Sequence, residues 1–149
     1  MIILDTNVLS ALMHAKPDPV VVSWLDQLPA ESIWITSVTL FEARYGLALL
    51  PQGNRRTMLT TQFEGFVEED LDGRVLLFDH VAADQAALLA AARKKRGCTV
   101  DMRDTFIAGI ALARKATLAT HNIRHFDDLT IQVVNPWEQK NQDKGGGDK

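Results

Sequence analysis

Short apolar runs alternate along this chain with longer segments whose apolar residues recur every three or four positions. A run of about four apolar residues closed by turn-forming residues is typical of a buried strand. The first run, residues 2–4, stops at Asp5-Thr6-Asn7. The strands predicted from this pattern cover residues 1–4, 32–35, 75–78, 117–120 and 131–134.

Segments with helical spacing separate these predicted strands. In one of them Val21, Trp24, Leu25 and Leu28 recur at helical intervals. The Ala-rich segment 81–96 ends at Gly97 after a basic last turn, which fits a glycine cap and the helix dipole. The predicted helices cover residues 8–13, 20–28, 38–50, 55–69, 81–96 and 101–115.

This alternation predicts an α/β, three-layer fold with a mostly parallel central sheet of about five short strands, flanked by helices. Right-handed crossovers would place every strand-to-helix junction at one edge of that sheet. We expect one domain over residues 1–137, closed by Pro136-Trp137. Residues 138–149 are polar and Gly-rich, so we expect a disordered tail there.

Composition narrows the function classes only slightly. The 149 residues are 46% hydrophobic and 23% charged, which is ordinary for a globular domain. A net charge of −3 argues against a surface coated with phosphate-binding Lys and Arg, although a bound metal could supply positive charge at a site. The single cysteine, Cys98, and the lack of a signal-peptide pattern or long apolar run favour a cytoplasmic location.

Three acids lie near the predicted junctions. Asp5 ends the first strand, Glu42 lies one turn into the helix after the second, and Asp104 opens the helix before the fourth. Each could simply serve a helix start, since Asp5 could be a cap and Thr39-x-x-Glu42 and Asp101-x-x-Asp104 resemble capping boxes. Ligands collect outside the carboxyl ends of parallel strands, so three acids from distant segments at that edge favour a common site.

Clustered carboxylates also indicate a cofactor. They repel one another when water is excluded, and a divalent cation removes that penalty. Oxygen ligands favour Mg²⁺ or Mn²⁺ over Zn²⁺. Such a metal polarises a phosphate and lowers the pKa of a bound water, which suits phosphodiester hydrolysis.

In these segments the chain resembles the PIN-domain ribonucleases, specifically the VapC or FitB type of toxin from bacterial toxin–antitoxin pairs. The resemblance runs in order from Met1 to Trp137. The matching segments are residues 2–9, 37–42 with Tyr45-Gly46, 103–108, 118–122 and Asn135-Pro136-Trp137.

The resemblance implies that Asp5, Glu42 and Asp104 are the catalytic acids that hold Mg²⁺ or Mn²⁺. Many PIN domains have a fourth acid where this chain has Asn122, so the resemblance leaves open whether the site holds one metal ion or two. Arg103, beside Asp104, is a candidate for phosphate contact from its position. The supporting residues expected around the acids are Thr6, Asn7, Thr120 and Asn122.

The expected function is therefore a metal-dependent endoribonuclease that acts as the toxin of a toxin–antitoxin pair. Its expected partners are an RNA substrate, a small antitoxin with a DNA-binding domain, and a second copy in a homodimer. A non-catalytic PIN-fold module that binds RNA or protein is the alternative. A phosphotransfer domain with Asp5 as phosphate acceptor is less favoured, because Lys16 and Lys115 are poorly placed to assist it.

Other residues carry weaker signals. The run Arg93-Lys94-Lys95-Arg96 is typical of a solvated helix end, and Arg44 could neutralise the acids. The helix over 55–69 could line a groove for the antitoxin or belong to the core. The three tryptophans are expected in core or dimer contacts. The loop residues left without a role are His121, His125 and Asp127.

Overall fold

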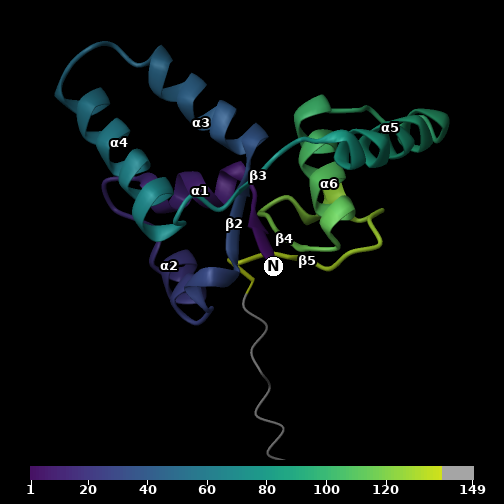
Figure 1. Cartoon of the computed structure of the whole chain (residues 1–149), viewed down its shortest axis with the longest axis horizontal. Helices are drawn as coiled ribbons and strands as arrows, with labels where there is room; N and C mark the ends of the chain where they lie inside the picture. The colour runs from purple at the N-terminus through teal and green to yellow at the C-terminus, as the bar shows by residue number, and fades with distance from the viewer. Residues whose placement is uncertain (139–149) are drawn as a thin grey trace, which may run out of the picture.

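The computed structural model describes residues 1–138, and its central sheet has five strands in the order β3-β2-β1-β4-β5, all parallel (Figure 1). Ile2 pairs with Ile33 on one side and with Thr117 on the other, so β1 lies in the middle. The predicted α/β fold is confirmed. The strands are β1 (Ile2–Leu4), β2 (Ile33–Thr36), β3 (Val75–Leu76), β4 (Thr117–Ala119) and β5 (Val133–Val134).

Six α-helices connect these strands in the part of the chain that the structure describes. The first begins at Thr6 rather than Val8, because the Asp5 carboxylate caps the Thr6 N–H. The segment predicted as one helix over 55–69 consists of the α-helix α4 (Asn54–Gly65), followed by a π-helical turn, η2 (Phe66–Asp70). The helices are α1 (Thr6–Met13), α2 (Pro19–Asp26), α3 (Ser37–Leu49), α4 (Asn54–Gly65), α5 (His80–Lys95) and α6 (Met102–Arg114).

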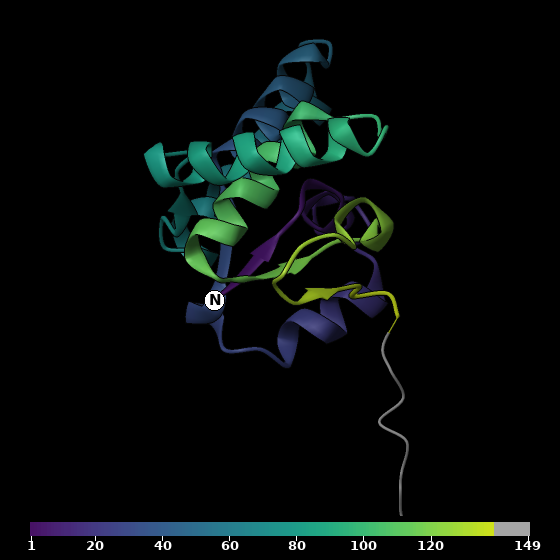
Figure 2. The ribbon, with the colours of Figure 1, turned by 90° about the vertical axis from the view of Figure 1, so that its right-hand side faces the viewer.

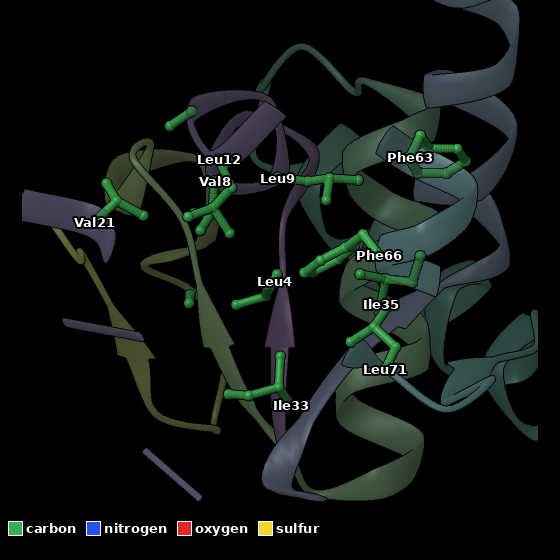
Figure 3. Packing of buried hydrophobic residues seen from close by; sticks show 12 residues of the cluster. Leu4, Val8, Leu9, Leu12, Val21, Ile33, Ile35, Phe63, Phe66 and Leu71 are labelled. Atoms are coloured by element: carbon green, nitrogen blue, oxygen red, sulfur yellow. The ribbon is translucent and has the colours of Figure 1, made fainter. Parts of the chain in front are cut away.

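Two apolar clusters cover the two faces of the sheet. The strand alternation assigns Leu4 to the cluster beneath α1 to α4, and Ile3 to the cluster beneath α5 and α6. Figures 1 and 2 show these helix groups on opposite sides of the strands. In Figure 3, Leu4 lies among side chains from α1 and β2, with Phe66 beside it. The carboxyl end of β1 therefore lies between two apolar cores, one on each face of the sheet.

Helices α5 and α6 pack unusually closely at Gly109. A Cβ atom placed there would lie 2.6 Å from the carbonyl oxygen of Ala82 and 2.7 Å from Cβ of Ala86. Since real Cβ atoms essentially never come this near, only glycine permits this approach.

Trp137, at the predicted end of the domain, is a packed residue. Trp137 packs against the α1-side cluster. The tail predicted over 138–149 lies outside the described residues, apart from Glu138, whose backbone N–H donates to the Asn135 carbonyl at 3.1 Å. Over residues 1–138, no helix combines the length and apolarity needed to span a bilayer.

Candidate active site

The carboxyl ends of β1 and β4 form the centre of the candidate site. The strand order reverses between these two strands, which opens a crevice at their carboxyl ends. The backbone N–H of Asp5 donates to the Ala119 carbonyl at 2.9 Å, so Asp5 and Thr120 leave the sheet side by side. Thr120 is fully buried, and its hydroxyl donates to Oδ2 of Asp5 at 2.7 Å.

Asp5 is a buried carboxylate in an acidic environment. Only 4% of its surface is exposed, and its other oxygen, Oδ1, accepts from the Thr6 N–H at 2.8 Å. Burial is the main cause that raises the pKa of Asp5 to about 6, and the negative charges of Asp104 and Glu42 add to it. The hydrogen bonds from Thr120 and Thr6 oppose the shift. The site therefore favours a proton or a cation at Asp5.

Glu42 points back toward Asp5 from the second turn of α3. Its Oε1 accepts from the Thr6 hydroxyl at 2.8 Å, and its Oε2 pairs with Nη1 of Arg103 at 3.3 Å. The capping box predicted for Thr39 and Glu42 is wrong. Thr36 is the cap of α3, and its hydroxyl accepts from the Thr39 N–H. Glu42 is therefore not needed to begin its helix.

Asp104 reaches the same edge from the first turn of α6. The capping interaction predicted here is confirmed, since the Asp101 carboxylate accepts from the Asp104 N–H at 3.0 Å. This leaves the Asp104 side chain free to contact Nδ1 of His125 at 3.1 Å. The sequence pattern had left His125 without a role, because a histidine in an irregular loop carries no periodic signal.

A buried ion pair supports the loop that carries His125. The prediction of a solvated helix end is wrong for Arg93, which is 6% exposed and binds the Asp128 carboxylate through Nε and Nη2 at 2.8 and 2.9 Å. Its Nη2 also donates to the His125 carbonyl at 2.8 Å. The hydrogen bond from Arg93 is the main cause that lowers the pKa of Asp128 to about 2. Arg93 thus ties α5 to the segment beside Asp104.

The supporting residues contribute unequally. Asn7 donates to Oδ2 of Asp5 at 3.3 Å, whereas Asn122 contributes through its backbone N–H, which donates to the Thr120 hydroxyl. Arg44 does not neutralise the acids, since it pairs with Glu64 at 3.8 Å. Asp127 ends the short 3-10 helix η3 (Ile123–Phe126) and lines a pocket beside Asp104.

The donor set fits a hard divalent cation, although the side chains are not already arranged around one. Across residues 1–138, no three acid, histidine or cysteine side chains are grouped as a metal site. Each outer acid is instead paired, Glu42 with Arg103 and Asp104 with His125. The donors near Asp5 are oxygens, and its raised pKa reflects neighbouring negative charge that a cation would offset.

Comparison with known sequences places this arrangement in a protein family. The model of the PIN domain matches residues 2–131. The chain is similar to VapC ribonuclease Y4jK of Sinorhizobium fredii, with 40% identity over 93% of this chain and 99% of that protein. It is also similar to toxin FitB of Neisseria gonorrhoeae, with 34% identity over 92% of this chain and 99% of that toxin.

Two solved structures that contain a chain similar to this one are complexes with DNA. A chain in the structure of FitAB bound to an IR36 DNA fragment superposes with a TM-score of 0.86 at 33% identity, covering 95% of this chain and 99% of that one. A chain of DNA-bound VapBC from Salmonella typhimurium gives a TM-score of 0.76 at 27% identity, covering 91% and 97%.

Proposed function

This chain belongs to the PIN domain family, and from that membership we propose that it is an endoribonuclease, the toxin of a toxin–antitoxin pair. Its relatives include proteins named VapC ribonuclease and tRNA(fMet)-specific endonuclease. The observation that carries the proposal is that three acids from distant segments act on one place: Thr6 is hydrogen-bonded to both Asp5 and Glu42, and the charge of Asp104 raises the pKa of Asp5. A purely binding module has no need for mutually repelling acids at one edge of a sheet, so the non-catalytic alternative is not favoured.

We propose Mg²⁺ or Mn²⁺ as the cofactor, held by Asp5, Glu42 and Asp104. When bound, such an ion polarises an RNA phosphate and supplies a water of lowered pKa. The protein contributes preorganisation, because Asp5 is held by Thr6, Asn7 and Thr120.

Arg103 is the cation best placed to meet the RNA backbone. Its side chain is 60% exposed, while the Glu42 side chain that it contacts is 18% exposed. A phosphate that approaches from solvent therefore reaches the guanidinium before the carboxylate. If Arg103 released Glu42 and bound the phosphate, it would lose one charge-assisted hydrogen bond and gain another, and arginine–phosphate contacts are often bidentate.

The proposed cofactor is tested by metal removal. We expect cleavage of single-stranded RNA by the purified chain to stop in EDTA and to return when Mg²⁺ or Mn²⁺ is added in excess. Calorimetry should detect Mn²⁺ binding to the wild-type chain at millimolar concentration. Cleavage that continues at full rate in EDTA would contradict the metal-dependent mechanism.

We propose that the antitoxin binds in an apolar groove between α1, α3 and α4. The groove has a volume of about 640 Å³ and is lined by Thr6 and Glu42, so an inserted segment would also cover Glu42. Helix α4 contributes Phe63 to the core, and both Phe63 and the exposed Met58 line the groove. An antitoxin segment with apolar side chains fits this lining. The apolar residues of this chain that line the groove include Leu9, Met13, Leu47, Met58 and Leu59.

Met58→Glu tests this groove. Met58 is 54% exposed, so the variant should fold while placing a charge among the apolar side chains of the proposed interface. We expect at least about a tenfold loss of affinity for the cognate antitoxin, measured by titration, with RNA cleavage retained. Thr61→Glu, an exposed position of α4 outside this groove, is the control. Equal affinity of Met58→Glu and wild type would exclude the groove.

We propose a homodimer through the exposed face of α3. Phe41, Tyr45 and Leu49 are each more than half exposed at intervals of four residues, and the first two rings stack at 5.9 Å. An apolar stripe of this kind is typical of an interface. We expect Tyr45→Glu to shift the mass measured by light scattering from dimer to monomer, while Gln62→Glu on α4 leaves it unchanged.

The compartment we propose is the cytoplasm, where RNA and antitoxin are made.

A further inference from the structure

A second cleft opens beside the acids, on the side of β4. It has a volume of about 700 Å³ and is lined by Asn7, His14, Lys16, His121 and Trp137, among others. Asn7 belongs to both sites, because its Nδ2 donates to Asp5 and its Oδ1 faces the cleft side, where it accepts from the His121 N–H at 3.1 Å. Any ligand in this cleft therefore lies next to the catalytic acids.

The cleft presents an exposed aromatic ring in a fixed position. The His121 ring packs edge-on against Trp137, with centroids 4.7 Å apart and planes at 75°. The His121 backbone is held on both sides, by Asn7 and by the Asn135 amide, which donates to its carbonyl at 3.5 Å. A surface histidine without a role would not be expected to have so many restraints.

Trp137 is itself anchored from two directions. Its indole Nε1 donates to the Asp18 carboxylate at 2.9 Å, and its backbone N–H donates to Oδ1 of Asn135 at 3.0 Å. The hydrogen bond from Trp137 is the main cause that lowers the pKa of Asp18, so that carboxylate stays charged and engaged. Lys16 is exposed at the rim of the cleft.

We propose that this cleft binds one unpaired nucleotide of the RNA next to the scissile phosphate. The base stacks on the His121 imidazole, which Trp137 backs, and Lys16 meets the phosphate. Base stacking on a preorganised ring has little ordering cost and tolerates every base. The cleft volume lies within the range of about 300–1,000 Å³ that small-ligand sites have. The inference rests on the proposed ribonuclease function and specifies how that enzyme would select single strands.

The test compares RNA with and without bases. The test uses the full chain with the substitution Asp5→Asn, which we expect to bind RNA without cleaving it. This variant is titrated with a short single-stranded RNA of mixed sequence and, separately, with an abasic oligonucleotide of equal length. We expect the RNA with bases to bind about five- to 150-fold more tightly, since each stacked base contributes on this scale. His121→Ala should reduce this ratio about tenfold, whereas His121→Phe, which keeps a ring, should retain it. His80→Ala, a solvent-exposed histidine at the start of α5, is the matched control.

The outcomes separate this inference from the proposed function. An unchanged ratio in His121→Ala, while the wild-type chain cleaves RNA, overturns the nucleotide cleft and leaves the ribonuclease intact. Loss of antitoxin binding alone in His121→Ala also overturns it, and assigns the cleft to a protein partner. A ratio that falls in His121→Ala and returns in His121→Phe supports the cleft, even if the wild-type chain proves unable to hydrolyse RNA.

Discussion

We expect the Asp5→Asn variant to lose RNA cleavage by at least about a thousandfold, because metal activation is worth several kcal/mol of transition-state stabilisation. Asp5 is the innermost of the three acids, and Thr6, Asn7 and Thr120 hold its two oxygens in place. Asparagine keeps the size of the side chain but removes the charge. Cleavage of a labelled RNA in excess Mn²⁺ measures the loss. A rate close to that of wild type would remove Asp5 from the mechanism.

The same variant should fold at least as well as wild type when no divalent ion is present. The pKa of Asp5 in the folded chain, about 6, lies above its ordinary value of 3.8, so the unfolded chain loses this proton first. The ionised Asp5 side chain therefore lowers the free energy of unfolding progressively as the pH rises from about 4 to 6, and this loss of stability persists above pH 6. Asp79→Asn, a helix cap at the start of α5, is the matched control and should leave cleavage unchanged. A melting curve at pH 8 separates lost chemistry from lost structure.

Asp128→Ala should destabilise the protein by about 3–5 kcal/mol, as expected when one partner of a buried ion pair is removed. Arg93 is almost fully buried, and among residues 1–138 Asp128 is the one carboxylate bonded to it. The variant leaves this guanidinium charged and without its counter-ion. For a domain of this size we expect the melting temperature to fall by about 10 °C. Calorimetry or chemical denaturation gives the difference in the free energy of unfolding.

The pH dependence of this effect has a defined sign. The pKa of Asp128 falls from 3.8 to about 2 on folding, so the ion pair stabilises the chain fully above about pH 4. This contribution is lost as the pH falls from about 4 to about 2, so the difference in stability between wild type and Asp128→Ala should shrink over that range. Asp127→Ala, one residue earlier and exposed, should change stability by less than about 0.5 kcal/mol. A comparable loss in both variants would show that the loop, rather than the ion pair, is responsible.

The order of elements and the three acids could be predicted because their signals are local. A short apolar run that stops at Asp5 identifies a strand end, and parallel strands place all such ends at one edge. The sequence could not give the strand order, which places β4 beside β1 and so brings Thr120 against Asp5. Strand order depends on packing between distant elements, for which no local pattern exists.

Arg93 illustrates a second kind of information that local sequence does not contain. Arg93, Lys94 and Lys95 form one basic run, yet Arg93 alone is buried. Arg93 binds Asp128 and the His125 carbonyl, which lie 35 and 32 positions later and meet it only in the folded chain, whereas Arg96 reaches the same carboxylate from an exposed position. The Thr36 cap was missed for a related reason, since Thr39 offers an equally good local capping pattern.

Gly109 connects the packing of two helices to the orientation of Asp104, one of the proposed metal ligands. It lies five residues after Asp104, which along a helix axis corresponds to about 7 Å. The contact with Ala82 and Ala86 prevents α6 from sliding or rotating against α5, and a shift of one residue would turn Asp104 by about 100°. Substitution of this glycine by alanine is therefore a means to misalign the enzyme without touching any of its acids. In directed evolution of activity, position 109 should tolerate fewer substitutions than its distance from the RNA suggests.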